Sequence, residues 1–229
     1  MTNLSHIDTW IFDLDNTLYH PKHRLFDQID AKMGAFISDM FDCDLVEARR
    51  IQKNYFHAHG TTLAGLMKDH GVQPDHFLDF VHNIVLDNLE AEAGLRDALA
   101  ALPGRRLIFT NADATYGMRV LERLGIADLF DGIFDIHDAV YVPKPAEAPY
   151  AAFAERYAIN PATSIFFEDM ARNLIAAHKL GLTTVWVDNG SESGDRDHDP
   201  EYVDHHIDDL VPFLQGVVDH FQVRGSPVT

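Results

Sequence analysis

The chain has 229 residues, of which 36 are acidic and 18 are basic, so its formal net charge is −18. This length fits one large domain or a core domain with one sizeable insertion. A field this negative repels nucleic-acid backbones and anionic lipid head groups, which excludes both as expected partners, and any phosphate site must supply its own positive charge. The single cysteine, Cys43, excludes an internal disulfide bond and a zinc site built on paired cysteines.

The N-terminal sequence shows no targeting signal. Residues 1–10 lack both the basic stretch and the apolar stretch of a secretory signal peptide. No apolar run reaches the roughly 18 residues that indicate a membrane-spanning helix. We therefore expect a cytoplasmic protein without a membrane partner.

Short apolar runs recur along the chain, each bounded by turn-forming or acidic residues. They are rich in Ile, Phe, Val, Trp or Leu, as is typical of strands buried on both faces. The runs are Thr9–Phe12, Arg106–Phe109, Gly132–Ile136, Ser164–Phe167 and Thr183–Val187. Helix-length segments with apolar residues three or four positions apart lie between the later runs, at Tyr116–Leu124, Glu147–Tyr157 and Leu174–Leu180. This alternation predicts an α/β fold with a Rossmann-like, doubly wound parallel sheet.

The segment from about residue 25 to residue 102 interrupts the alternation. Its apolar residues keep helical spacing, as in Phe77, Phe80, Val81, Ile84 and Val85, and no part of it predicts a strand. We expect three to five helices inserted directly after the first strand. The predicted domains are an α/β core of residues 1–20 and 95–229 and a helical cap of residues 21–94. Residues 188–209 are predicted to be a loop, and residues 210–221 a short closing helix.

The strongest chemical signal is the pair Asp13 and Asp15 at the end of the first predicted strand. In an extended backbone, residues two apart point to the same side. Ligands of open α/β sheets bind outside the carboxyl ends of the strands, where this pair would lie. Two close carboxylates stay ionised only beside a cation, or they act as an acid–base pair. The alternative is a pair of loop or helix-capping aspartates, because such a motif also arises by chance in an acidic chain.

Two further polar motifs follow later strands. Thr110 and Asn111 come directly after residues 106–109 and offer a hydroxyl, an amide and the N–H groups of a helix start, which suit an anion. Alternatively, they only cap that helix. Lys144 lies between Pro143 and Pro145, which restrict the backbone and present the ammonium group in a fixed direction. A solvated surface lysine is the alternative there.

Glu168 and Asp169 follow residues 164–167 on a turn that enters a helix. Adjacent oxygen ligands beside two other aspartates predict a hard-cation site, for Mg²⁺ rather than Zn²⁺. Alternatively, they only favour the helix N-terminus electrostatically. With Asp13 and Asp15 they bring about four negative charges against the single positive charge of Lys144, so we expect no phosphate to bind without a metal ion.

The four motifs together resemble those of the haloacid dehalogenase-like (HAD) hydrolase superfamily, in the same order along the chain. The matching residues are Asp13 and Asp15, Thr110 and Asn111, Lys144 and Pro145, and Glu168 and Asp169. The resemblance covers about residues 8–190. It implies phosphoryl transfer to an aspartate, with Mg²⁺ as the cofactor and a small phosphate ester as the substrate. A non-catalytic binding or regulatory protein on a relict hydrolase fold is the alternative, and it would predict the loss of a motif residue, which this sequence does not show.

The resemblance also implies a role for each motif residue. Asp13 would attack phosphorus, and Asp15 would protonate the leaving oxygen and then activate the hydrolytic water. The implied Mg²⁺ ligands are the Asp13 carboxylate, the Asp15 backbone carbonyl and Asp169, with Glu168 as a direct or water-mediated support. The implied phosphate-binding residues are Thr110, Asn111 and Lys144.

Finer features are most similar to the pyrimidine 5′-nucleotidase branch of this superfamily. The presence of Asp15 favours phosphate esters, because the dehalogenase members lack this acid–base aspartate. The helical insertion corresponds to the family's helical cap, which closes over small substrates and excludes water. The matching stretches are residues 13–19, 60–66, 110–112 and 166–169.

The cap supplies the expected contacts with the rest of the substrate. Thr61 and Thr62 are the predicted substrate-binding residues, and Tyr55, Phe56 and His57 precede them and could contact a base. A helix cap and a turn inside the bundle are an equally good interpretation of the two threonines. A sugar-phosphate or phosphoglycolate phosphatase, or a phosphomutase, on the same core is the alternative to the nucleotidase.

Overall fold

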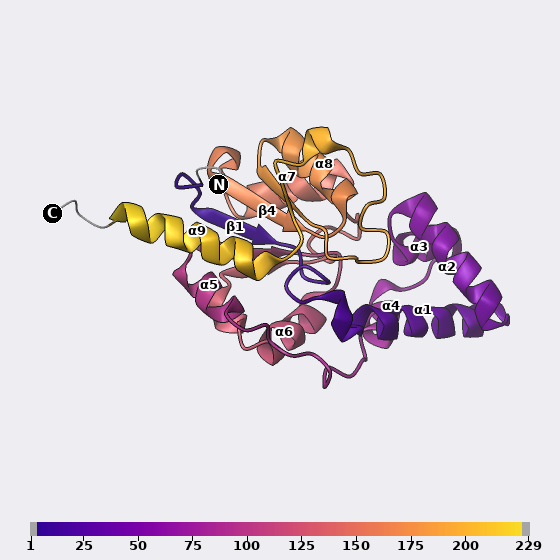
Figure 1. Cartoon of the computed structure of the whole chain (residues 1–229). Helices are drawn as coiled ribbons and strands as arrows, with labels where there is room; N and C mark the ends of the chain where they lie inside the picture. Colours follow the sequence, from indigo (N-terminus) through magenta and orange to yellow (C-terminus); the bar gives the residue numbers. More distant parts are fainter. Residues whose placement is uncertain (1–3, 226–229) are drawn as a thin grey trace.

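The computed structural model describes residues 4–225, which form a parallel sheet flanked by helices (Figure 1). The strand order is β3-β2-β1-β4-β5-β6, so the first strand lies in the middle of the sheet. The strands are β1 Thr9–Phe12, β2 Arg105–Phe109, β3 Gly132–Phe134, β4 Ser164–Glu168, β5 Thr183–Val187 and β6 His205–Ile207. The core helices are α5 Leu95–Ala101, α6 Ala114–Arg123, α7 Glu147–Arg156, α8 Ala171–Leu180 and α9 Leu210–Gly225. The predicted doubly wound α/β architecture is confirmed.

Helices cover both faces of the sheet because the strands carry apolar side chains on both sides. In β1, Trp10 and Phe12 pack into a core cluster that contains residues of α5, α6 and α9. Ile11 points the opposite way and joins a second cluster with residues of α7 and α8. All three side chains are fully buried, which explains why β1 is a continuous apolar run rather than an alternating one.

The register of the central strands brings their carboxyl ends to one edge of the sheet. Phe12, the last residue of β1, lies opposite Ile108 of β2 and Phe167 of β4. The N–H group of Asp13 donates to the carbonyl oxygen of Phe167 at 2.9 Å, which extends the ladder by one step. The residues that follow β1, β2 and β4 therefore emerge side by side.

Four more helices pack against one another beyond this edge of the sheet (Figure 1). They are α1 Leu25–Phe41, α2 Leu45–His59, α3 Thr62–His70 and α4 Pro74–Val81. Local sequence explains where they begin: the Asp44 carboxylate accepts the Glu47 N–H group at the start of α2, and Pro74 is the first residue of α4. We call this helical layer the cap. Helix α5 packs against α9 of the core instead, and the domain boundaries at residues 21 and 94 stay a prediction.

The predicted loop over residues 188–209 is wrong in part. It contains a 3₁₀ helix and the edge strand β6, in which His205 lies opposite Val185 of β5. The remaining 3₁₀ helices are η1 Pro21–His23, η2 Ala127–Leu129 and η3 Pro161–Thr163, and the one in this segment is η4 Pro200–Tyr202. A three-residue edge strand that carries two histidines has no apolar run, so its sequence gives no strand signal.

Two other elements are shorter than predicted. The helical pattern over residues 77–85 ends at Val81, and His82 forms the C-cap of α4. The predicted strand over residues 132–136 ends at Phe134. The Asp135 carboxylate accepts the N–H groups of His137 and Asp138, and these hydrogen bonds turn the chain. Within residues 4–225, no helix is long and apolar enough to cross a membrane.

Candidate active site

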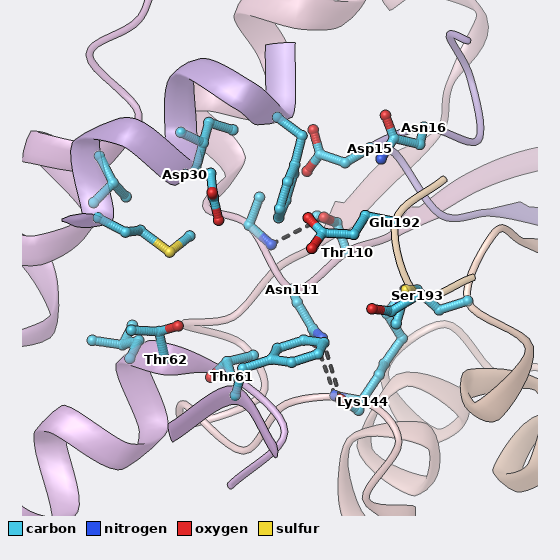
Figure 2. Close-up of a pocket in the computed structure, with 18 of the residues that line it drawn as sticks. Asp15, Asn16, Asp30, Thr61, Thr62, Thr110, Asn111, Lys144, Glu192 and Ser193 are labelled. Atoms are coloured by element: carbon cyan, nitrogen blue, oxygen red, sulfur yellow. Dashed lines mark hydrogen bonds between the residues drawn. The ribbon is translucent and has the colours of Figure 1, made fainter. Parts of the chain in front are cut away.

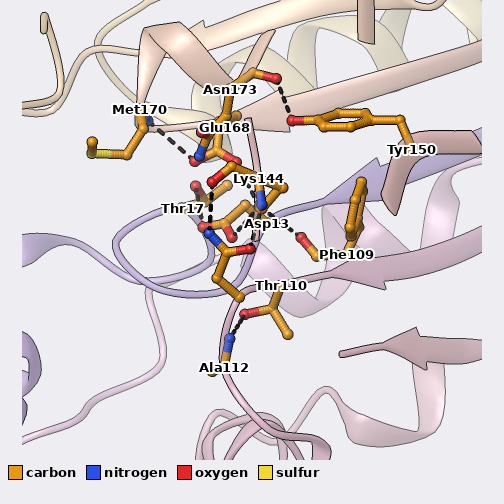
Figure 3. A network of polar contacts seen from close by, with 11 residues as sticks. Asp13, Thr17, Phe109, Thr110, Ala112, Lys144, Tyr150, Glu168, Met170 and Asn173 are labelled. Carbon is orange, nitrogen blue, oxygen red and sulfur yellow. Dashed lines mark hydrogen bonds and ion pairs between the residues drawn. The ribbon is translucent and has the colours of Figure 1, made fainter. Parts of the chain in front are cut away.

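Side chains from three strand ends and one loop meet at the carboxyl edge of the sheet. Asp13 follows β1, Thr110 follows β2, Glu168 ends β4 and Lys144 comes from the loop after β3. All four side chains are buried. The first requirement of the sequence prediction, that these residues lie together, is met by the geometry (Figure 3).

Lys144 lies at the centre of the group. Its Nζ atom donates to Asp13 Oδ1 at 2.8 Å, to Glu168 Oε2 at 2.6 Å and to the carbonyl oxygen of Phe109 at 2.8 Å. An ammonium group has three protons, so a phosphoryl oxygen could contact Nζ only by sharing or replacing one of these partners. Burial by itself lowers the pKa of Lys144, but the charges of Asp13 and Glu168 outweigh it and raise that pKa above its ordinary value. Lys144 is therefore a buried cation, and the alternative of a solvated lysine is wrong.

Asn111 fixes the backbone of Lys144. Its Oδ1 atom accepts the Lys144 N–H group at 2.8 Å, and its Nδ2 atom donates to the Lys144 carbonyl oxygen at 3.3 Å. Both ends of the amide are thus engaged by the lysine, although Asn111 also lines the cavity described below. Thr110 Oγ1 accepts the Ala112 N–H group at 3.0 Å, and its hydroxyl proton remains to be donated.

Three buried carboxylates, two of which bond to Lys144, could hold a metal ion. Asp13, Glu168 and Asp169 each offer an oxygen, and these oxygens lie within 4.8 Å of one another. Burial, together with the charge of Glu168, raises the pKa of Asp13 to about 7, although Lys144 opposes this shift. Burial and the charge of Glu168 also raise the pKa of Asp169 well above its ordinary value. When ionised, the three carboxylates and Lys144 have a net charge of −2. This excess of buried negative charge fits a divalent cation with oxygen ligands.

Neighbouring polar atoms show how these oxygens are shared. Glu168 Oε1 accepts the Met170 N–H group at 3.2 Å while Oε2 accepts from Lys144, so both of its oxygens already have protein partners. Asp13 Oδ2 accepts from the Thr17 hydroxyl at 3.2 Å. Asn173 Oδ1 is buried in the same cavity lining without any hydrogen-bond partner. An unpartnered buried oxygen in the lining of the same cavity adds to the fit of this site to a hard cation.

The Asp15 side chain lines the same cavity, and its hydrogen-bond partners are two tyrosines rather than members of this cluster. Its Oδ1 atom accepts hydrogen bonds from the hydroxyl groups of Tyr19 at 2.5 Å and Tyr116 at 2.8 Å. Burial raises the pKa of the Asp15 carboxyl, and the two tyrosine hydrogen bonds oppose that shift. A raised pKa lets this buried carboxyl keep its proton to a higher pH than a solvated aspartate does, which suits a group that must donate a proton.

A cavity of about 240 Å³ lies between the core residues and the cap (Figure 2). Asp15, Thr110 and Lys144 line it from the core, and Asp30 and Thr62 line it from the cap. Figure 2 also shows Glu192 and Ser193, from the loop after β5, at its border. The predicted catalytic and metal-binding residues therefore line one cavity between the core and the cap.

The predicted cap residues also reach this cavity, but their side chains have local partners. Thr61 Oγ1 accepts the Ala64 N–H group at 3.1 Å and so caps α3, and Thr62 Oγ1 donates to the Gln52 carbonyl oxygen at 3.4 Å. Both threonines line the cavity, and substrate contact by either one stays a prediction.

Of the three aromatic residues that precede the threonines, Phe56 alone is part of the described cavity lining. The Tyr55 hydroxyl instead bonds to His70 at 2.6 Å, and the His57 ring lies 3.4 Å from the Arg196 guanidinium group.

Several residues around the cavity were not predicted from the sequence. Tyr116 lies on the buried side of α6, where its spacing indicates only a core residue. Gln52 and Asp30 belong to different cap helices and meet at 2.6 Å. Arg172, from α8, lines the cavity and lies 4.5 Å over the Phe56 ring. These contacts are set by tertiary packing, and no local pattern signals them.

The fold and the acidic site together define a hydrolase of the HAD type. The family model for haloacid dehalogenase-like hydrolases matches residues 7–181, and the chain belongs to this family. Among solved structures, it is similar to a HAD-hydrolase, YfnB, of Bacillus subtilis that is bound to magnesium, with a TM-score of 0.60 at 16% identity over 92% of this chain and 98% of that one. It is also similar to a HAD phosphatase of Thermococcus onnurineus, with a TM-score of 0.59 at 17% identity over 96% of this chain and 98% of that one.

Two further relatives carry more specific names. A predicted phosphoglycolate phosphatase of Haemophilus somnus has a TM-score of 0.65 at 17% identity, over 93% of this chain and 99% of that one. Phosphate metabolism protein 8 of Saccharomyces cerevisiae is 27% identical over 191 residues, which are 76% of this chain. The match spans 59% of the length of the yeast protein.

Proposed function

We propose that the protein is a Mg²⁺-dependent phosphatase that hydrolyses a small phosphate monoester through an aspartyl-phosphate on Asp13. The observation that carries this proposal is the direct contact of Asp13 with the buried Lys144, inside a cluster completed by Glu168 and Asp169 at the cavity between core and cap. A carboxylate held in this way is oriented for attack, and the ammonium group offsets the charge of an incoming phosphate. The name of the Thermococcus relative, a HAD phosphatase, favours the same reaction class, and the name of the yeast relative refers to phosphate metabolism.

Mg²⁺ fits the donor set of this site. The side chains of Asp13 and Asp169 and the backbone carbonyl of Asp15 would hold it, with Glu168 in support. The net charge of −2 on the ionised cluster and the unpartnered Asn173 Oδ1 support this assignment. When bound, Mg²⁺ supplies positive charge beside the phosphoryl oxygens.

The chain's own residues carry the proton and bond changes. An oxygen of Asp13 attacks phosphorus, while Asp15 gives its proton to the leaving oxygen as the bond from phosphorus to that oxygen breaks. Asp15 then takes a proton from a water molecule, whose oxygen attacks phosphorus and releases Asp13. The hydroxyl proton of Thr110 is available to a phosphoryl oxygen, because Thr110 Oγ1 already accepts from the backbone. Lys144 holds the Asp13 carboxylate in place, and its charge favours the ionised form of Asp13.

The proposed substrate is a pyrimidine nucleoside 5′-monophosphate, and the cap side of the cavity supports this choice. Gln52 Nε2 donates to Asp30 Oδ1, which leaves Gln52 Oε1 buried and without a partner. The opposite amide orientation would put oxygen against a carboxylate, so the free atom is an acceptor. A buried free acceptor suits a donor on the edge of a base. The Phe56 ring also lines this cavity and offers an apolar contact for a planar base.

A phosphate-release assay with and without Mg²⁺ tests the proposal. The panel contains UMP, CMP, AMP, glucose 6-phosphate, phosphoglycolate and p-nitrophenyl phosphate. We expect Mg²⁺-dependent release that is fastest with UMP or CMP. If AMP, glucose 6-phosphate or phosphoglycolate is cleaved equally well, the pyrimidine assignment is wrong but the phosphatase assignment stands. If none of the panel is cleaved, the phosphatase assignment is wrong too.

The cap assignment has its own test in Gln52→Leu. Losing one hydrogen bond worth about 1 kcal/mol in the transition state should lower kcat/KM for the nucleotide about fivefold. The value for p-nitrophenyl phosphate, which has no base, should stay unchanged. Gln73→Leu, an exposed glutamine of the same cap, is the matched control. An equal loss with both substrates would show that Gln52 supports the cap rather than contacts a base.

A further inference from the structure

Two tyrosine hydroxyl groups converge on a single oxygen of Asp15. Tyr19 lies four residues further along the chain, and Tyr116 comes from the buried face of α6. Both donate to Asp15 Oδ1, at 2.5 and 2.8 Å, and their own hydroxyl oxygens are 3.4 Å apart. The two rings are 3% and 1% exposed, so water does not compete for either hydroxyl. Oδ1 is therefore saturated by fixed donors.

The second oxygen of Asp15 is left for the reaction. Among residues 4–225, no hydrogen-bond donor contacts Oδ2, and Asp15 lines the cavity that also holds Asp13 and Thr110. Because Oδ1 accepts two hydrogen bonds and Oδ2 accepts none from the described residues, the orientation of the carboxyl group is fixed. The oxygen that is free to carry and transfer a proton is the one that the tyrosines do not hold.

The hydroxyl of Tyr116 is itself held in place by the residues around its ring. The ring stacks on His82, with the centroids 4.5 Å apart and the planes at 12°. His82 Nδ1 bonds to the Asp113 carboxylate, and Asp113 also caps α6 by accepting the Tyr116 N–H group at 2.8 Å. The Arg119 guanidinium group donates to the His82 carbonyl oxygen at 3.0 Å. This second layer of contacts makes the Tyr116 hydroxyl a rigid donor rather than a mobile one.

We infer that Tyr19 and Tyr116 are positioning residues that clamp Asp15 Oδ1 and thereby aim Oδ2 at the leaving oxygen. The inference rests on the proposed function of Asp15. In the first step the proton on Oδ2 moves to the leaving oxygen, which keeps the electron pair of its broken bond to phosphorus. Asp15 becomes a carboxylate, and the two O–H donors stabilise that charge more strongly than they stabilise the neutral acid. In the second step Oδ2 takes a proton from the attacking water, and the bond between Asp13 and phosphorus breaks.

Tyr19→Phe, Tyr116→Phe and the double variant test the clamp, because phenylalanine keeps the rings and the His82 stack. The measured quantity is kcat/KM for a series of phosphate esters, from p-nitrophenyl phosphate to alkyl phosphates. This ratio reports the steps up to leaving-group departure, so it isolates the acid role of Asp15. An alkoxide needs a proton to leave, whereas p-nitrophenolate does not. We expect each hydroxyl removed to cost about tenfold with alkyl esters and less than about twofold with p-nitrophenyl phosphate.

Controls separate a positioning role from a structural one. Tyr157→Phe removes a hydroxyl that bonds to the Ile133 carbonyl oxygen away from the site, and it should leave the series unchanged. The Mg²⁺ concentration for half-maximal activity should be the same in the wild type and in all four variants. Equal losses with alkyl and aryl esters, or no loss in the double variant, would overturn the clamp.

Asp15→Asn tells a failed clamp from a failed function. If kcat/KM of this variant falls selectively with alkyl esters and that of the tyrosine variants does not, Asp15 is the acid and the clamp is wrong. If Asp15→Asn shows no dependence on the leaving group, the proposed role of Asp15 is wrong and the clamp is wrong with it.

Discussion

Replacing Lys144 by methionine removes a buried ammonium group from a cluster of carboxylates. The methionine side chain approximates the length of the lysine stem, so the change acts mainly on charge and hydrogen bonding. Lys144 donates to Asp13, Glu168 and the Phe109 carbonyl oxygen, and its side chain is 1% exposed. The variant leaves Asp13 and Glu168 buried without their cation.

The size of the effect follows from this burial. Removing one partner of a buried ion pair costs about 3–5 kcal/mol, and 1 kcal/mol shifts the Tm of a chain this size by about 2–4 °C. We therefore expect the Tm of the metal-free Lys144→Met variant to fall by about 6–20 °C at pH 8.5. Lys179→Met, which changes a half-exposed lysine on α8, should shift the Tm by less than about 2 °C.

The Tm difference between the wild type and Lys144→Met should depend on pH. In the wild type the pKa of Asp13 is about 7, above its ordinary value, because burial and Glu168 outweigh Lys144. Without Lys144 that pKa rises further, so at pH 6 the carboxyl takes a proton and needs no cation. The Tm difference between wild type and variant should shrink by at least half between pH 8.5 and pH 6. Thermal unfolding followed by circular dichroism in a chelating buffer measures it, and an equal difference at both pH values would refute this electrostatic account.

The remaining predictions concern the reaction and its metal. Asp13→Asn should keep its fold and lose turnover, because an amide cannot form an acyl phosphate, and more than a few per cent of wild-type phosphate release would contradict this role. Asp15→Asn should have a lower turnover rate and an unchanged Mg²⁺ affinity, whereas Asp169→Asn should bind Mg²⁺ more weakly. Calorimetric titrations measure these affinities, and equal affinities of the two variants would mean that the division of roles is wrong. In the metal-free protein the raised pKa of Asp13 makes its contribution to stability present at low pH and lost as the pH rises through about 7. At a hundredfold excess over Kd, Mg²⁺ should raise the Tm by about 5–10 °C. Because Mg²⁺ binds the ionised form of Asp13, this increase should be larger at pH 8 than at pH 6. The opposite order would argue against this site.

The core of the site was predictable because parallel strands bring their carboxyl ends to one edge. Asp13, Thr110 and Glu168 each follow or end an apolar run, and the register of β1 with its neighbours places them together. The prolines around Lys144 marked a fixed lysine, and the structure buries it in the middle of the carboxylates. These predictions depended on local patterns and on one general property of α/β sheets.

The contacts that refine the site were not predictable in the same way. Tyr116 is separated from Asp15 by 101 positions, and its spacing in α6 is that of any buried aromatic residue. Asn111 was expected to bind an anion, but its amide is engaged by the backbone of Lys144, a contact that depends on how two loops pack. The edge strand β6 has no apolar run, so its pairing with β5 is visible only in three dimensions. Tertiary packing decides each of these cases.

The central claim, an aspartyl-phosphate on Asp13, can be tested by trapping that intermediate. Asp15→Asn incubated with p-nitrophenyl phosphate and Mg²⁺ should form the acyl phosphate, because this leaving group needs no acid, and should hydrolyse it slowly, because the base is missing. Acid quenching followed by peptide mass mapping locates the phosphoryl group. We expect one phosphoryl group on Asp13, and none in the Asp13→Asn, Asp15→Asn double variant. Stoichiometric release of p-nitrophenol with the phosphoryl group on another residue, or on none, would contradict it.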